Sequence, residues 1–294
     1  MATKARKHGG WQDWITDRFL RGLIGLALAL PWETRSRLMG WFTRRVLSPA
    51  VGYRKRAIAN LTYIHPDMPG SEKRRIADAV ADNAGRTMIE NYDTAGLLER
   101  TKNQAITGVG LPVIEQARKD GTPVLMVTAH YANFEIPRAA LVNRGFQIGG
   151  LYRPMSNPFF NEHYAENMKR LSGPVFEKGK RGTLGLIRHI AKGGFGVLLF
   201  DLHDRNGIPI PFLGKPAPTL TSAAEIAMRT GALLVPFFAT RQPDGVSFEV
   251  EIEAPIAHTT PEEMTTEMTR RLEQRIATHP EQWFWIHRRW SKTL

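Results

Sequence analysis

Short apolar runs alternate with amphipathic segments from residue 123 to the end of the chain. The apolar runs are bounded by glycine, proline or polar residues, which is typical of buried strands. They lie at 123–129, 147–153, 196–201, 233–240 and 247–254. Segments with helical spacing lie at 134–144, 157–171, 183–192, 222–230 and 260–279, the last opened by a Thr-Pro-Glu-Glu start. This alternation predicts an α/β fold in which a mostly parallel mixed sheet is flanked by helices.

The first hundred residues have helical spacing throughout. Residues 11–47 predict one or two helices, and further helices are expected at 53–64 and 71–99, the latter capped by Ser71. The run at 22–32, GLIGLALALPW, is apolar over 11 residues. A helix that crosses a bilayer needs roughly 17–25.

The run at 22–32 has three interpretations. A signal-peptide core fits poorly, because no small-residue cleavage site follows it. A buried helix of a globular domain is the plain alternative. Tryptophans and arginines on both sides instead favour a segment that enters one leaflet of a membrane. We therefore expect an N-terminal helical membrane-associating region at 1–50 and an enzymatic domain at 51–294.

Charge strengthens the membrane interpretation. The 294 residues contain 40 Lys and Arg against 28 Asp and Glu, a net charge of +12. Residues 1–75 hold 15 basic and 5 acidic residues, so +10 of that charge lies around the apolar run. A basic chain favours nucleic acid, an acidic protein or a phospholipid surface. No nucleic-acid-binding module is recognisable, so we expect an anionic membrane surface and no nucleic acid.

Several reaction classes are excluded by what the sequence lacks. The chain has no cysteine, which removes thiolate nucleophiles, disulfides, cysteine-ligated zinc and iron–sulfur clusters. It also lacks the G-x-S-x-G turn of serine hydrolases, the phosphate-binding P-loop and a G-x-G-x-x-G after a strand. Serine hydrolases, P-loop enzymes and dinucleotide-binding enzymes therefore lose support.

Polar residues follow the strand at 123–129, in the order VTAHYANFE. In parallel sheets, sites lie beyond the carboxyl ends of strands. His130 is expected in the turn, Asn133 as the cap of the next helix, and Glu135 in its first turn. A histidine held by a carboxylate is a good general base. The alternative is a surface histidine beside a helix-capping glutamate, and the spacing alone does not separate the two.

Two more strand ends carry candidate residues. Arg153 follows the strand at 147–153 and suits a phosphate or carboxylate, although pairing with a nearby acid is the simpler interpretation. Asp201 ends the strand at 196–201, with His203 and Asp204 in the next loop. Aspartate and histidine both occur in metal sites, but no further cluster accompanies these three residues, so we expect no metal. A proline- and glycine-rich connection at 207–218 is expected to form a rigid site wall.

Five blocks in this order resemble the bacterial lipid A late acyltransferases, the lauroyl/myristoyl transferase family. They are AHYANFE, LYRP, FDLHDRNGIPIPFLGKPAPT, LLVPFFATRQPDG and PEQWFWIHRRW, and the resemblance covers about residues 10–294. It implies an enzyme without cofactor on the cytoplasmic face of the inner membrane of Gram-negative bacteria. It further implies transfer of a fatty acyl chain from acyl-acyl carrier protein to a hydroxyacyl chain of a phosphorylated lipid A precursor.

The resemblance implies that His130 and Glu135 are catalytic and that Arg153 and Asp201 matter. We expect Arg153, Asp201 and Asn133 to bind substrate. As a hypothesis, His130 removes the proton of the acceptor hydroxyl while Glu135 orients the imidazole, and Arg153 binds either the oxyanion or a substrate phosphate. Three alternatives stay open: the same chemistry on another lipid, hydrolysis of acyl groups, and a non-enzymatic membrane protein that recruits acidic partners.

Overall fold

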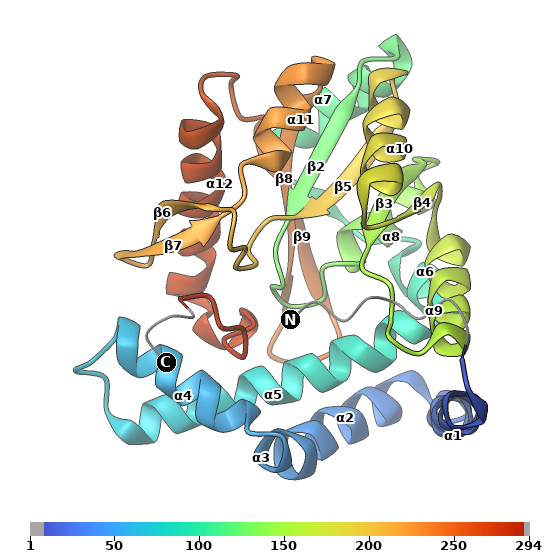
Figure 1. The fold of residues 1–294 in the computed structure, drawn as a ribbon, viewed down its shortest axis with the longest axis vertical. Helices are drawn as coiled ribbons and strands as arrows, with labels where there is room; N and C mark the ends of the chain where they lie inside the picture. The colour runs from blue at the N-terminus through green and yellow to red at the C-terminus, as the bar shows by residue number, and fades with distance from the viewer. Residues whose placement is uncertain (1–8, 291–294) are drawn as a thin grey trace.

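A seven-stranded sheet forms the centre of the protein, in a computed structural model that describes residues 9–290 (Figure 1). Its strand order is β1-β9-β8-β2-β5-β3-β4. Strand β9 runs antiparallel to β8, and the other neighbouring strands are parallel. The strands are β1 (Ile106–Thr107), β2 (Val124–Thr128), β3 (Ile148–Tyr152), β4 (Val175–Glu177), β5 (Phe195–Leu199), β8 (Leu233–Arg241) and β9 (Phe248–Ile252). The predicted α/β fold with a mostly parallel mixed sheet is confirmed.

Helices cover both faces of this sheet. Alternate side chains of β2 enter different apolar clusters: Leu125 and Val127 pack in one, and Val124 and Met126 pack in the other. A strand buried on both faces needs a continuous apolar run rather than an alternating one, as residues 124–127 provide. The covering helices are α6 (Thr94–Thr101), α7 (Gly110–Asp120), α8 (Ile136–Asn143), α9 (Pro158–Leu171), α10 (Lys180–Ala191), α11 (Ser222–Thr230) and α12 (Pro261–Thr278).

The N-terminal helices lie across the end of the sheet at which β2 and β5 finish (Figure 1). They are α1 (Trp11–Leu28), α2 (Trp32–Phe42), the π-helical turn Thr43–Leu47, α3 (Ser48–Ala50), α4 (Tyr53–Ile64) and α5 (Gly70–Tyr92). The expected helices at 11–47 and 53–64 are confirmed. Within residues 9–290, none of the helices is both long enough and apolar enough to cross a membrane.

Large apolar side chains are nevertheless exposed on these N-terminal helices. We call them the N-terminal apolar face: Trp11, Trp14, Ile15, Phe19, Leu20, Leu23, Leu26, Leu38, Trp41, Phe42 and Val46. They form much of the exposed apolar surface that the described residues provide. A water-soluble protein rarely leaves so many large apolar groups together in water, so this face is a candidate interaction surface.

Some expected elements differ from the structure. The single helix expected at 71–99 is wrong: α5 ends at Tyr92, and the carboxylate of the next residue, Asp93, accepts the backbone N–H of Gly96 at 2.9 Å and caps α6. Ser71 is not a cap, because α5 begins at Gly70, directly after Pro69. The cap at Thr260 is confirmed, with Glu263 completing a capping box.

The connection at 207–218, expected as a rigid site wall, folds into a β-hairpin. Strands β6 (Ile208–Phe212) and β7 (Lys215–Thr219) pair antiparallel outside the main sheet. Both strands carry prolines at alternate positions, IPIPF and KPAPT, so the hairpin pairs only through its other residues. The short strands β1 and β4 were also not expected.

Candidate active site

His130 and Asp201 meet because the strands that precede them are neighbours in register. Thr128 at the end of β2 pairs with Leu199 at the end of β5. The imidazole Nδ1 of His130 lies 2.8 Å from Asp201 Oδ1, and the backbone N–H of His130 donates to Asp201 Oδ2 at 3.0 Å. The carboxylate therefore fixes both the ring and the backbone of His130.

Asp201 is buried and charged. Burial would raise its pKa, but His130 and, less strongly, His287 lower it by more, so that pKa lies well below the ordinary value. The indole N–H of Trp283 donates to Asp201 Oδ2 at 3.0 Å and gives the carboxylate a third donor. A charged Asp201 accepts the Nδ1 proton of His130, which leaves the lone pair on Nε2 for use as a base.

Glu135 does not hold His130, contrary to the sequence-based hypothesis. It is the N-cap residue of α8, and its Oε2 lies 3.2 Å from Nη1 of Arg138, one turn along that helix. Arg138 is buried and also donates to the carbonyls of Ile148 and Ser172, at 2.9 and 3.1 Å. Glu135 thus faces Arg138, and the carboxylate that serves His130 comes from the neighbouring strand.

Asn133 is not the cap of α8 either. It is fully buried, and its Oδ1 accepts the backbone N–H of Glu135 at 3.1 Å. Its Nδ2 donates to Oε2 of Glu90 on α5 at 2.9 Å. Asn133 therefore braces the turn between β2 and α8, and it lies too deep to contact a substrate in this conformation.

Arg153 lies where the sequence places it, directly after β3, with an exposed side chain. Among residues 9–290 it has no hydrogen bond or ion pair, so the expected pairing with a nearby acid is not seen there. Arg153 is not part of the cavity that His130 borders.

A cavity of about 850 Å³ begins at His130 and extends beneath the N-terminal helices. Its walls are mostly apolar, with Glu135 and Arg138 near His130. Five apolar residues that line the cavity are also exposed on the outside of the protein: Leu20, Leu23, Leu38, Phe42 and Met88. The cavity therefore opens beside the N-terminal apolar face.

The C-terminal segment completes the site. The sequence singled it out only as the block PEQWFWIHRRW of the family resemblance. The backbone N–H of Phe284 donates to the carbonyl of His130 at 3.0 Å, and Trp283 reaches Asp201. The His287 ring lies 5.0 Å from that of His130, between centroids. Burial, followed by the nearby His130, lowers the pKa of His287 to about 4, so this second imidazole is neutral. In the sequence, the density of aromatic residues at 283–290 is the feature that sets apart Trp283, Phe284 and His287.

The site thus combines a carboxylate-held histidine with a large, mostly apolar cavity. Within the described residues, no cluster of three or more metal-binding side chains is present. The sequence pattern of the bacterial lipid A biosynthesis acyltransferases matches residues 1–292, and the chain belongs to that family.

Individual relatives agree with this assignment. The chain is 23% identical to a lipid A biosynthesis acyltransferase of Haemophilus influenzae, over 94% of this chain and 86% of that protein. It is 25% identical to the lipid A biosynthesis lauroyltransferase of Escherichia coli, over 96% and 92%. A phosphatidylinositol mannoside acyltransferase of Mycobacterium tuberculosis is 22% identical over 63% of this chain and 60% of its own length.

Proposed function

We propose that the protein transfers a fatty acyl chain from acyl-acyl carrier protein to the hydroxyl of a hydroxyacyl chain on a phosphorylated lipid A precursor. The observation that supports this most is the position of His130, held by Asp201 at one end of an apolar cavity of about 850 Å³. An apolar cavity of this size accommodates an acyl chain, and the base stands where the chain's reactive end would lie.

The proposed reaction is a direct transfer. Nε2 of His130 takes the proton of the acceptor hydroxyl as its oxygen attacks the thioester carbonyl carbon. The new C–O bond forms, the C–S bond breaks, and the imidazolium returns its proton to the leaving thiolate. Asp201 holds the ring and stabilises its transient positive charge. No covalent enzyme intermediate is required, which agrees with the absence of cysteine.

The remaining candidate residues have separate places in this proposal. Glu135 lies in the cavity wall, where its carboxylate accepts a hydrogen bond from a hydroxyl of the acceptor. Arg153 lies outside the cavity and is exposed, which favours contact with a substrate phosphate over contact with the oxyanion.

The proposed setting is the cytoplasmic face of the inner membrane of a Gram-negative bacterium. The N-terminal apolar face, with tryptophans and interspersed arginines, suits the interface of an anionic bilayer. The cavity opens beside this face, so a lipid substrate reaches His130 from the membrane plane.

The test is acyl transfer in membranes with purified acyl-acyl carrier protein and a lipid A precursor. His130→Ala should lower turnover about 10²–10⁴-fold, which is the usual contribution of a general base. His258→Ala removes an exposed histidine far from the cavity and should transfer at the normal rate. Near-normal turnover by His130→Ala would reject the proposed role of His130.

A second acceptor class is favoured by the mycobacterial relative, whose name specifies a phosphatidylinositol mannoside. The same His130 chemistry serves any lipid hydroxyl. An acceptor screen with the wild-type protein separates the two, because only the true acceptor should gain one acyl group by mass spectrometry. Release of free fatty acid alone would instead indicate a hydrolase.

A further inference from the structure

A buried ion pair lies behind the turn that carries His130. Glu90 of α5 and Arg241 at the end of β8 are 1% and 8% exposed. Nη1 and Nη2 of Arg241 each lie 2.8 Å from a different oxygen of Glu90, so the contact is bidentate. Burying such a pair contributes little net stability by itself, because both charges lose their water. Its location therefore calls for another explanation.

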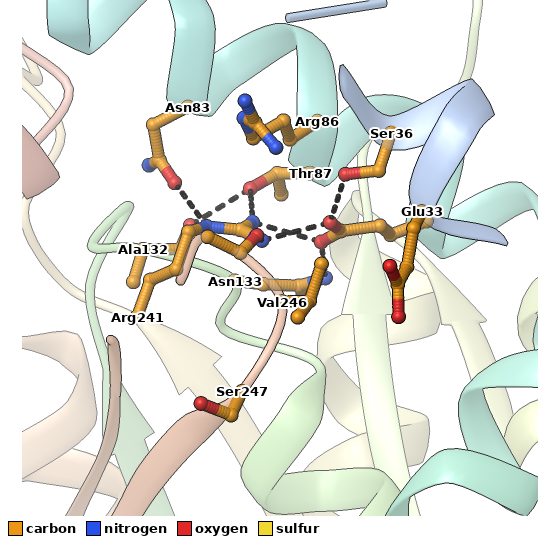
Figure 2. Close-up of polar contacts among 12 residues, drawn as sticks. Glu33, Ser36, Asn83, Arg86, Thr87, Ala132, Asn133, Arg241, Val246 and Ser247 are labelled. Carbon is orange, nitrogen blue, oxygen red and sulfur yellow. Dashed lines mark hydrogen bonds and ion pairs between the residues drawn. The ribbon is translucent and has the colours of Figure 1, made fainter. Parts of the chain in front are cut away.

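The pair is connected to the turn by side-chain hydrogen bonds. Asn133 donates to Oε2 of Glu90 at 2.9 Å and accepts the N–H of Glu135, so it joins the ion pair to the last residue before α8. The Thr87 hydroxyl donates to the carbonyl of Ala132 at 3.1 Å and lies 3.5 Å from Nη2 of Arg241. Figure 2 shows Asn83, Thr87 and Asn133 gathered around the Arg241 guanidinium.

A second connection passes through the C-terminal segment. The amide of Gln282 forms two hydrogen bonds with the backbone of Arg241, both 2.8 Å long. The carbonyl of Gln282 accepts the N–H of Ala132 at 2.8 Å. Both backbone groups of Ala132 are therefore tied to Arg241, one through Gln282 and the other through Thr87.

Ala132 needs this support because its backbone is strained. Its φ of 44° lies in the left-handed region, which residues other than glycine rarely adopt. This conformation reverses the chain between His130 and α8. Without partners on both sides, Ala132 would relax toward an ordinary conformation and move His130 relative to the cavity.

The same carboxylate is also connected to the N-terminal helices. Ser36 of α2, fully buried, donates to Oε1 of Glu90 at 2.7 Å. Helix α2 contributes residues to both the cavity and the N-terminal apolar face. Burial alone would raise the pKa of Glu90. The hydrogen bonds from Arg241, Ser36 and Asn133 and the charge of Arg241 lower that pKa by more, so Glu90 is charged.

We propose that Glu90 and Arg241 are positioning residues, which hold the turn 130–135 through Asn133, Thr87 and Gln282 so that His130 faces the cavity. Neither residue touches the reacting atoms. The activity assay for this inference rests on the proposed acyl transfer, whereas a spectroscopic assay on the free protein does not.

The first test is Glu90→Gln, which keeps the size of the side chain but removes its charge. Turnover should fall about 10- to 100-fold with the KM for the acyl donor within about twofold, because displacements near 1 Å have effects of this size. Glu253→Gln is the matched control: it breaks a partly buried carboxylate's pairing with Arg271 and Arg275 between β9 and α12. That control should lose stability and keep its turnover.

The second test is rescue by exchange. In the double variant Glu90→Gln with Asn133→Asp, the new amide donates to the new carboxylate, which still accepts the N–H of Glu135. The negative charge stays in the network and the bond between positions 90 and 133 is restored, but the amide no longer accepts from Nη2 of Arg241, so turnover should rise above that of Glu90→Gln without reaching wild type. A double variant no faster than Glu90→Gln would overturn the proposal.

The third test covers the case in which Glu90→Gln does not fold. Thr87→Val removes the bond to Ala132 and leaves the ion pair intact, whereas Thr87→Ser keeps that bond. Valine should slow transfer several-fold and serine should not. Equal rates in the two variants would contradict the inference.

The free protein provides a readout that needs no substrate. In proton NMR, the Nδ1 proton between His130 and Asp201 should give a downfield signal in wild type and Glu253→Gln, and should broaden in Glu90→Gln. If wild type shows this signal but transfers no acyl group, the proposed function fails while the positioning inference is still tested. An unchanged signal in folded Glu90→Gln would refute the positioning role.

Discussion

Three donors surround the Asp201 carboxylate: the ring and backbone N–H of His130 and the indole of Trp283. All three favour the charged form, and burial prevents water from replacing them. Asp201 therefore selects one tautomer of His130 and leaves the lone pair on Nε2, the atom proposed as the base. This single residue decides whether the histidine is ready to accept a proton.

Asp201→Asn should lower turnover about 10²–10⁴-fold, because an amide neither stabilises the imidazolium nor fixes the required tautomer. The measurement is steady-state acyl transfer with saturating donor. Glu253→Gln provides the comparison, since Glu253 pairs with Arg271 and Arg275 and contacts neither His130 nor Asp201. If Asp201→Asn turns over within about threefold of the wild-type rate, this role of Asp201 is excluded.

Sequence reasoning named His130 and Asp201 but paired His130 with the wrong carboxylate. Glu135 is near in sequence, and a histidine and a carboxylate five positions apart suggest contact when the chain turns sharply between them. The chain does turn, at Ala132, but α8 then directs Glu135 toward Arg138. His130 pairs with Asp201 because β2 and β5 are neighbours in the sheet. The apolar sequence of a strand does not specify which strand will lie beside it.

Elements were predictable where periodicity is strong and boundaries are chemically marked. Strands β2, β3, β5, β8 and β9 and the capped helix α12 follow directly from their patterns. The break at Asp93 was missed because the apolar spacing continues across it into α6. The hairpin of β6 and β7 was missed because proline at alternate positions is typical of loops, although it is tolerated in a two-stranded edge ribbon.

Helix α1 supplies the prediction at this scale. Phe19 is 64% exposed on the N-terminal apolar face, and Val109, 67% exposed, lies away from it before α7. Phe19→Glu should weaken binding to anionic vesicles about tenfold or more, because inserting one large apolar side chain contributes on the order of 1.5–3 kcal/mol. Val109→Glu is the matched control for adding a negative charge. Cosedimentation with vesicles measures both, and equal binding by the two variants would show that α1 does not contact the membrane.

At the scale of the whole molecule, the C-terminal segment closes the fold over its own active site. Trp283, Trp285 and Trp290 are buried against the β6–β7 hairpin and α4, and the same segment contacts His130 and Asp201. Asn60 on α4 donates to the carbonyls of Trp285 and His287, at 2.7 and 2.6 Å. Global stability and the integrity of the site therefore depend on the same residues.

His287 makes that stability depend on pH. Its pKa is about 4 in the folded protein and about 6.5 when exposed, so the unfolded chain takes up a proton first as the pH falls. The neutral His287 therefore leaves the free energy of unfolding intact above pH 6.5, and that free energy declines as the pH falls from 6.5 to 4. His287→Gln should reduce this decline by about 1–3 kcal/mol.

Chemical denaturation in detergent micelles at pH 7 and pH 4.5 measures the effect of His287. His258→Gln is the control, since it replaces an exposed histidine elsewhere in the fold and should show the same decline as wild type. If His287→Gln loses as much stability between the two pH values as wild type does, another group is responsible.

The cavity wall formed by Leu20, Leu23 and Leu38 has a kinetic consequence, because these side chains face both the cavity and the outside. In the membrane setting proposed above, an acyl chain that passes between them exchanges one apolar environment for another. A route through water would add about 0.8 kcal/mol for each methylene exposed, and the barrier would rise steeply with chain length. A lateral passage removes that dependence, so chain length affects the fit inside the cavity and leaves the rate of entry and exit unchanged.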